Sequence, residues 1–328
     1  MKTSNERGSA LLTVLWLSAG LTAIALSVAS SVRAETDRVE ADSNGLRAYY
    51  LATGAVERGI QWMVWADQDV RNPDGSPRFW DYNLARLNMT FPSGSAVVEM
   101  IPESSKLNID FASPDQLTRL IAVVCGDEGR AREIAAGIVD WRSGAAEPTA
   151  FDEFYSGIAP TFRARHASFQ EIEELLFVRG MTPELFYGNY LPGDQGVLYA
   201  TGGLRDALSV WGSTGQFDVN TVSPALMASL GMTPDAVHSI VAHRTATPFK
   251  NLAEVSDLGV PPVGLGLGGN YIWTLRASAR LNPSGTLRTA SATVKLVNRK
   301  LYQIPVHVLR WYDDAWSEAA ISPAGVTR

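Results

Sequence analysis

The most regular feature of the sequence is an apolar stretch near its start that passes directly into an amphipathic one. Ser9 to Val32 are 24 consecutive positions without a charged side chain. As a helix they would extend over about 36 Å, enough to cross a bilayer. Beyond them, apolar or small side chains recur three, four or seven residues apart, the spacing of one helix face. This stripe consists of Val39, Leu46, Tyr49, Thr53, Val56, Ile60 and Met63. The pattern predicts one helix from about Ala10 to Ala66, first in lipid and then against a domain.

Two other interpretations of this segment are open. The apolar run could be a secretory signal peptide, with Ala29-Ser30-Ser31 as the cleavage site. It could also be a signal anchor followed by an unrelated helix. The length of the run and the unbroken helical period after it favour the continuous helix.

The remaining chain alternates between strand-like and helix-like patterns. Asp67 to Phe91 is polar and rich in turn residues, which predicts a loop with short strands at most. β-branched or alternating runs predict strands at residues 96–101, 272–281, 289–297 and 302–311, with the turn 282–285 between the second and third of them. The tail at residues 314–328 is predicted to be disordered.

A short motif occurs twice in the middle of the chain. Residues 107–114 and 217–224 each read as a brief strand followed by Ser-Pro. Ser113 and Ser223 suit the N-cap of a helix, and the prolines suit its first position. Helices are predicted after each copy, at residues 116–124 with 130–142 and at 226–230 with 234–245, and a further helix-turn-helix capped by Thr182 is predicted at 168–186.

The N-terminus resembles the leader of type IV pilins and pseudopilins. A short charged segment ends in Arg7-Gly8, and a uniformly apolar helix follows. The resemblance implies cleavage after Gly8 by a prepilin peptidase, with Ser9 as the first mature residue. It also implies a glutamate at the fifth mature position, where this chain has Thr13. In the family, that carboxylate neutralises the terminal ammonium of a neighbouring subunit in lipid.

In lacking that glutamate, the chain resembles the K-type minor pseudopilins of type II secretion systems. The order of several internal strings is similar to that family, although residues 192–215 match it poorly and their role is left open. These strings are Leu107-Asn-Ile-Asp110, Ile138-Val-Asp-Trp-Arg142, Gly144-Ala-Ala-Glu147 and Glu174-Leu-Leu-Phe-Val-Arg-Gly-Met-Thr182. The resemblance implies a structural subunit at the pseudopilus tip that helps to initiate assembly and binds the I- and J-type minor pseudopilins. It implies a single pass through the bacterial inner membrane, with the C-terminal bulk in the periplasm.

The expected fold class is α+β. A pilin-like long N-terminal helix packs on an antiparallel sheet, and a large, mainly α-helical inserted domain with helix-hairpin-helix-like units interrupts that sheet. The predicted divisions are a leader at 1–8, a transmembrane part at 9–33, a periplasmic helix with first strands at 34–105, the insertion at 106–265, the last strands at 266–313 and the tail at 314–328. The stripe, with Val39, Leu46, Tyr49, Val56, Ile60 and Met63 as its apolar members, is expected to pack against partner subunits.

Composition and charge narrow the classes of function that the chain can have. The 328 residues carry a net charge of -6, so nothing in the total points to a polyanion as partner. Cys125 is the single cysteine, which excludes an intrachain disulfide. It has no histidine or other base nearby in sequence, and the four histidines lack zinc-ligand spacing. We therefore expect no enzyme activity.

An alternative is a membrane-anchored minor pilin or competence-type protein that binds DNA. Leu230-Gly-Met-Thr-Pro234 followed by Ile240-Val-Ala-His-Arg244 resembles a helix-hairpin-helix. Residues 216–255 carry two basic and three acidic side chains, a poor set for binding phosphates. We therefore expect no nucleic-acid partner.

A loop near the end of the long helix carries four oxygen-bearing side chains. They are Asp67, Asp69, Asn72 and Asp74. Calcium prefers oxygen ligands of this kind, although the spacing does not match an EF-hand. Pseudopilins often bind calcium, so the resemblance makes calcium a candidate cofactor here.

Overall fold

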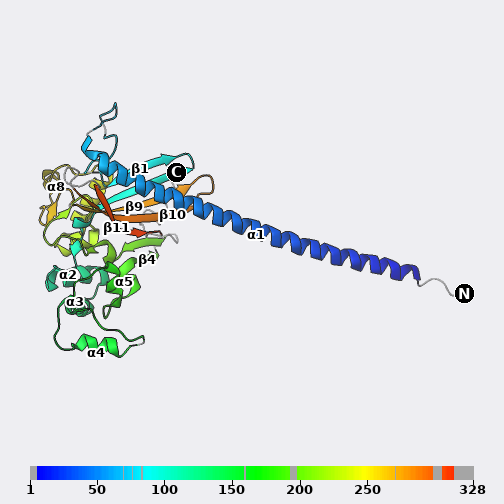
Figure 1. Cartoon of the computed structure of the whole chain (residues 1–328), viewed down its shortest axis with the longest axis horizontal. Coiled ribbons are helices and arrows are strands. Elements are labelled where there is room, and N and C mark those ends of the chain that lie inside the picture. Colours follow the sequence, from blue (N-terminus) through cyan, green and yellow to red (C-terminus); the bar gives the residue numbers. More distant parts are fainter. Residues whose placement is uncertain are drawn as a thin grey trace.

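The fold is that of a long helix carrying a two-part head. A computed structural model describes residues 6–68, 70–75, 77–82, 84–158, 160–192, 198–269, 271–297 and 305–313. Helix α1 (Glu6–Trp65) is one continuous helix of 60 residues, as the sequence predicts, and a 3-10 turn (Ala66–Gln68) follows it. Its first half projects away from the head, and its second half lies on a sheet (Figure 1). The predicted tail at 314–328 lies outside the described residues.

The sheet is antiparallel, with the strand order β1-β2-β9-β10-β11. Its strands are β1 (Arg86–Phe91), β2 (Gly94–Pro102), β9 (Ile272–Leu281), β10 (Leu287–Leu296) and β11 (Val306–Tyr312). Four of them confirm the predicted strands, and the turn between β9 and β10 falls where it was expected. Strand β1 is a short strand at the end of the predicted loop at 67–91, where the sequence left short strands open. Leu87 and Met89 are buried on one face of β1, and they alternate with exposed residues.

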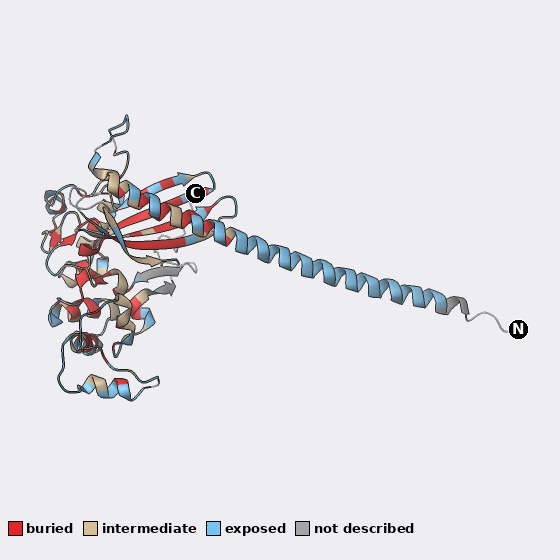
Figure 2. Ribbon diagram, viewed as in Figure 1, coloured by how far each residue is buried: buried red, intermediate tan, exposed pale blue. Residues whose placement is uncertain are grey.

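Small side chains bring α1 close to the sheet. Buried residues on this face of α1 include Ala48, Ala52, Ala55 and Gly59, and they face alanines on β9 and β10. A Cβ added to Gly59 would lie 2.8 Å from Cδ2 of Leu275, closer than carbon atoms pack. The red strands of the sheet, with the red and tan turns of α1 that lie over them, mark this core (Figure 2).

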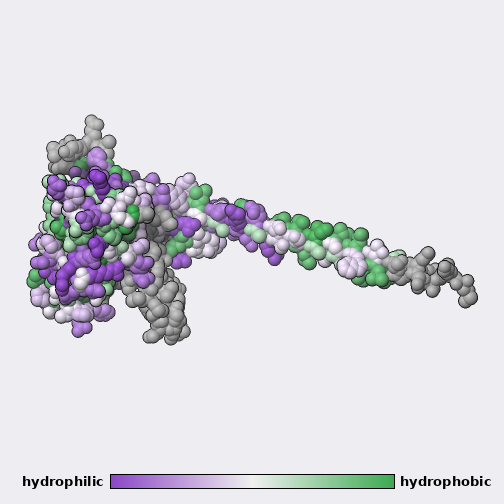
Figure 3. Space-filling model, turned by 90° about the horizontal axis from the view of Figure 1, so that it is seen from below, coloured by the Kyte–Doolittle hydropathy of each residue, from purple (hydrophilic) through white to green (hydrophobic). Residues whose placement is uncertain are grey.

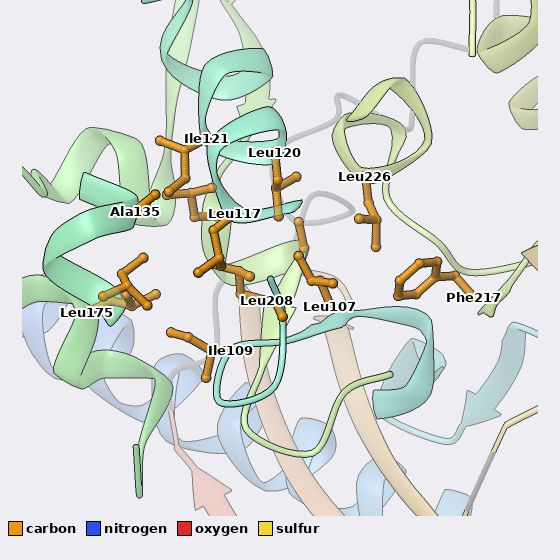
Figure 4. Packing of buried hydrophobic residues seen from close by; sticks show 14 of the residues in the cluster. Leu107, Ile109, Leu117, Leu120, Ile121, Ala135, Leu175, Leu208, Phe217 and Leu226 are labelled. Carbon is orange, nitrogen blue, oxygen red and sulfur yellow. The ribbon is translucent and has the colours of Figure 1, made fainter. Parts of the chain in front are cut away.

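The segment between β2 and β9 has a core of its own. It contains α2 (Pro114–Cys125), α3 (Glu128–Arg142), α4 (Ala150–Ser156), α5 (Pro183–Tyr187), α6 (Pro224–Ser229), α7 (Pro234–Ala246) and α8 (Ala253–Asp257). It also contains the 3-10 helices η2 (Glu103–Ser105), η3 (Ile172–Phe177) and η5 (Leu204–Asp206), and the short strands β3 (Leu107–Asn108), β4 (Gly188–Pro192), β5 (Leu198–Gly202), β6 (Leu208–Ser209), β7 (Phe217–Asp218) and β8 (Leu265–Gly266). Leu107, Leu117 and Leu208 meet at the centre of its core (Figure 4).

Three details differ from the sequence prediction. Helices α4 and α8 were not predicted, although the Thr149–Asp152 capping box is a signal for α4. The first half of the predicted helix-turn-helix at 168–186 is the 3-10 helix η3, whereas α5 begins at Thr182 as expected. The poorly matching residues 192–215 include Leu204 and Leu208, which belong to the buried core.

The two Ser-Pro motifs form equivalent local structures. Ser113 accepts a hydrogen bond from the Gln116 amide at 3.2 Å, and Ser223 accepts one from the Leu226 amide at 3.2 Å, so both predicted caps are confirmed. An arginine from a later helix closes each turn. Arg142 donates to the carbonyl oxygens of Ile109 and Ala112. Arg244 donates to those of Val219 (3.0 Å) and Val222 (2.8 Å), the positions that correspond when the two motifs are aligned.

His166 fastens the linker between α3 and α4. Its Nε2 lies 2.9 Å from Oδ2 of Asp152, and its Nδ1 lies 3.2 Å and 3.1 Å from the carbonyl oxygens of Asp140 and Ser143. Both ring nitrogens therefore face acceptors, which suits the doubly protonated ring. The bond to Asp152 raises the pKa of His166, against a smaller opposing effect of burial.

This arrangement predicts a stability that declines as pH rises. A raised folded-state pKa gives stabilisation that is complete below the unfolded value of about 6.5 and is lost as pH rises through the folded value. We expect the difference in urea midpoint between residues 34–328 and its His166→Gln variant to shrink from pH 5.5 to pH 8.5. His307→Gln, at an exposed position on β11, serves as the control. A difference that is constant or grows with pH would contradict the prediction.

Candidate assembly interface

The first half of α1 presents an uncharged surface. Ala10 to Val32 are exposed along their whole length, and no other described part of the chain covers them. Among the described residues, α1 is long and apolar enough to cross a membrane. The green surface along the outer part of the helix shows this segment, and hydrophilic residues follow it toward the head (Figure 3). The helix therefore indicates a single-pass membrane anchor.

The predicted processing site lies at the start of α1. The backbone at Gly8 and Ser9 is helical, and their surroundings lie outside what the structure describes. Thr13 lies within the uncharged exposed part, and no carboxylate occurs between Ala10 and Val32. Cleavage after Gly8 stays a prediction.

The predicted partner-packing stripe is divided by the structure. Val56 and Met63 are buried against the chain's own sheet, so the prediction that they face a partner is wrong for this conformation. Ile60 is half-buried on the same core. The error arose because the large apolar residues were taken to mark the stripe, whereas small residues mark the face that meets the sheet. Val39 and Leu46 remain 59% and 56% exposed.

Tyr49 has a partner within the chain. It is half-buried, and its hydroxyl donates to Oδ1 of Asp313 at 2.8 Å. The same carboxylate oxygen accepts from Nε1 of Trp311 at 2.9 Å. The bond to Asp313 raises the pKa of Tyr49. Asp313 thus ties α1 to the end of β11.

An exposed apolar stripe remains on α1 between the membrane part and the sheet. It consists of Val32, Val39, Leu46 and Tyr50, spaced seven, seven and four residues apart. We call these four residues the outer stripe. Residues seven apart on a helix lie close to one face, so the outer stripe can meet a second helix lengthwise. The stripe predicted from the sequence did not include Val32 and Tyr50. Val32 was counted with the lipid segment, and Tyr50 adjoins Tyr49, which was assigned to the stripe.

The candidate calcium ligands are only partly described. Asn72 and Asp74 are exposed, and the side-chain Nδ2 of Asn72 lies 3.4 Å from the Pro77 carbonyl oxygen. The side chain of Asp67 and the whole of Asp69 lie outside the described residues. Among the described residues, no group of three or more His, Cys, Asp or Glu side chains is placed to hold a metal ion. Calcium binding by this loop stays a prediction.

In the second Ser-Pro unit, the groups that a DNA-binding hairpin would direct at phosphates are hydrogen-bonded within the chain. Arg244 points into its own turn, as described above. In the hairpin turn, the amide of Gly231 donates to the Ala228 carbonyl at 2.9 Å, and that of Met232 donates to the Met227 carbonyl at 3.4 Å. These groups therefore do not face a phosphate, which disfavours the DNA-binding alternative.

Comparison with known proteins supports one family. Residues 82–188 match the family model described as type II secretion system (T2SS), protein K. The chain carries a protein K domain. The matched residues run from just before β1 to α5 and include the first Ser-Pro unit. The resemblance drawn from the sequence, to a K-type minor pseudopilin, is confirmed.

The fold of the whole chain is also similar to a solved structure. It matches a chain of the crystal structure of the GspK-GspI-GspJ complex from the type 2 secretion system of enterotoxigenic Escherichia coli. The two chains are 14% identical with a TM-score of 0.52, and the match covers 85% of this chain and 100% of that chain. Identity this low shows the fold alone. No curated protein matches the sequence.

The protein K family is a structural, non-enzymatic part of the secretion system. The expectation that this chain is not an enzyme is in agreement with that family. The parts of the chain that bear on assembly are therefore the anchor, the outer stripe and the inserted helical segment.

Proposed function

We propose that this protein K chain caps the tip of a type II secretion pseudopilus, together with I- and J-type minor pseudopilins, and helps to initiate its assembly. The observation that carries the proposal is the outer stripe, an apolar face of α1 that the chain does not cover. The similar fold of a chain from the GspK-GspI-GspJ complex supports the choice of partners. Helices of two further pseudopilins would cover the outer stripe.

The shape of the head supports a position at the end of a filament. The inserted segment at residues 106–265 extends to one side of the line of α1, at the end of the molecule away from the membrane helix (Figure 1). A subunit stacked above it would meet this bulk. Thr13 fits the same position, because a subunit without the carboxylate cannot neutralise the ammonium of a neighbour.

The two Ser-Pro units are proposed to serve as packing units of the cap. Their helix-hairpin-helix-like form holds the inserted core together through Arg142 and Arg244. The proposed orientation places the N-terminus in the cytoplasm and the head in the periplasm of the bacterial inner membrane. A prepilin peptidase would remove residues 1–8.

Leader cleavage is tested by mass. Coexpression of the full chain with the peptidase is expected to remove eight residues and leave Ser9 at the N-terminus, as measured by intact mass spectrometry. Gly8→Leu is expected to prevent cleavage, whereas Asn5→Ala, within the leader, should not. An N-terminus near Ala34 would contradict the pilin-like processing.

Complex formation tests the tip assembly. Residues 34–328 are mixed with the corresponding I- and J-type fragments, and the mass is measured by light scattering after gel filtration. We expect a 1:1:1 species. Three separate monomers at tens of micromolar would contradict the proposal, and retention on immobilised duplex DNA would then support the alternative.

A substitution in the outer stripe makes the test specific. Leu46→Asp places a charge in an apolar contact, and we expect Kd to rise by about 10- to 100-fold, or about 1.4–2.8 kcal/mol. Ala41→Asp makes a similar change at an exposed position, about 200° around the helix from Val39. Equal effects of the two variants would show that another surface carries the contact.

A further inference from the structure

The head contains two cores that do not merge. The first consists of buried residues from Leu107 to Leu265, and we call residues 106–265 the inserted body. The second joins α1 to the sheet, with buried members at positions 51–100 and 273–294, and we call α1 and the sheet the pilin-like body. Among the described residues, no buried apolar side chain belongs to both cores. What lies between them therefore decides how firmly the two bodies are joined.

The face of the sheet that meets the inserted body is polar. Ser291 and Thr293 on β10 are buried there, beside Thr274 and Arg276 on β9. A cavity of about 290 Å³ lies between the two bodies and is large enough for several water molecules. Its lining includes Glu99, Arg276 and Ser291 from the sheet and Asp206, Trp211 and Arg244 from the inserted body. The junction is thus unlike the dry core on the other face of the sheet.

The direct links across the junction are polar or charged. Nη1 of Arg276 lies 3.4 Å from Oδ1 of Asp206, and Nε of Arg310 donates to Oε2 of Glu171 at 2.6 Å. The guanidinium of Arg205 lies 5.6 Å from the ring centre of Tyr312. The Arg310 and Glu171 side chains are 36% and 39% exposed, so water and salt weaken their attraction.

Two of the charged groups keep a partner when the junction opens. Arg276 also pairs with Glu99 of β2 at 2.8 Å, within the sheet. Glu103 follows the crossing at Pro102, keeps Lys106 at 2.9 Å and the hydroxyl of Ser209, and loses only its bond to Thr274 at 2.7 Å. Opening therefore leaves neither of these charges buried without a partner. A buried charge without a partner is the usual large cost of separating ionic contacts.

The chain passes between the two bodies at one place. It enters the inserted body after Pro102 and leaves it before Trp273. A Cβ added to Gly269 would lie 2.2 Å from Cβ of Pro102, so the two crossings touch. A pair of adjacent crossings permits rotation without separating the bodies.

We propose that the inserted body turns as a rigid unit about the Pro102–Gly269 crossing, and that the ion pairs Arg276–Asp206 and Arg310–Glu171 hold it closed. Polar interfaces between domains of one chain are commonly the ones that move. The turning would change the angle of the inserted body to α1. This inference concerns the chain alone and does not depend on its partners.

The distance between the two bodies tests the proposal in the full chain in detergent. Cys125→Ser removes the native thiol, and spin labels are placed at Gln61 on α1 and Arg119 on α2, both exposed. A second label pair, Arg119 with Asp235 on α7, lies within the inserted body. Double electron–electron resonance gives both distance distributions at 0.05 M and 1 M salt.

We expect high salt to at least double the fraction of a second distance for the first pair and to leave the second pair unchanged. Asp206→Asn combined with Arg310→Gln should give the same change at low salt. Arg132→Gln breaks an exposed pair within α3 and should have no effect. One unchanged distribution for the first pair under all conditions would overturn the proposal. A change within the inserted body would overturn it too, because the body would not be rigid.

Discussion

Replacing Glu103 with leucine is expected to lower the free energy of unfolding of residues 34–328 by about 3–5 kcal/mol. Glu103 is 3% exposed. Its carboxylate accepts from Lys106 and Thr274 and from the hydroxyl of Ser209. Leucine would leave the Lys106 ammonium, itself 15% exposed, without its counter-charge. Urea unfolding measures the loss.

Two variants separate the buried charge from other effects. Glu103→Gln keeps the shape and one acceptor oxygen, so we expect a smaller loss than for leucine. Glu128→Leu removes a carboxylate that is 78% exposed and paired with Arg132, and we expect a change within about 0.5 kcal/mol. A loss for Glu103→Leu no larger than that for Glu128→Leu would contradict the buried pairing.

The effect of Glu103 should fade in acid. Burial by itself would raise its pKa, but the Lys106 ammonium and the hydroxyls of Ser209 and Thr274 together place the pKa below its usual value. A lowered folded-state pKa gives stabilisation that is present above about pH 4.3 and is lost as pH falls through the folded value. The difference between the wild-type chain and Glu103→Leu should therefore narrow below pH 4.

Arg142→Leu is expected to lower the free energy of unfolding by about 2–4 kcal/mol. Its guanidinium donates to the carbonyl oxygens of Ile109 and Ala112, and the leucine variant would leave both without that donor. Arg244→Leu should act in the same direction, because Arg244 makes the corresponding bonds in the second Ser-Pro unit. Thermal and urea unfolding of residues 34–328 measure both.

The control for this prediction lies on the same helix. Arg132 is 68% exposed and pairs only along α3 with Glu128 in the described structure, so Arg132→Leu should change stability by less than about 0.5 kcal/mol. Equal losses for Arg132→Leu and Arg142→Leu would mean that the turn carbonyl oxygens find other donors.

Much of the backbone could be predicted because its signals are local. Strand β9 alternates between buried Leu275, Ala277 and Ala279 and more polar neighbours, and its predicted ends agree with the structure. The Ser-Pro caps at Ser113 and Ser223 depend on a few adjacent residues, and so does the start of α5 at Thr182. Helix α1 was predictable because its apolar run and its amphipathic part share one period.

The candidate site was harder to predict because its features depend on residues far apart in sequence. Ala52 and Gly59 face the sheet only because alanines occupy β9 and β10 opposite them. A search for large apolar residues therefore assigned Val56 and Met63 to the wrong surface. The roles of Arg142 and Arg244 depend on bonds to carbonyl oxygens 22 to 33 residues earlier, which no local pattern reveals.

The continuity of α1 gives the molecule a mechanical property. Its 60 residues contain no proline, and as a helix they form a rod about 90 Å long, roughly three times the thickness of the hydrocarbon core of a bilayer. A rod without a break carries an axial displacement from one end to the other undiminished. It also magnifies rotation, since a tilt of about 10° in the membrane swings the far end through about 15 Å. Small movements of the anchor therefore become large movements of the head.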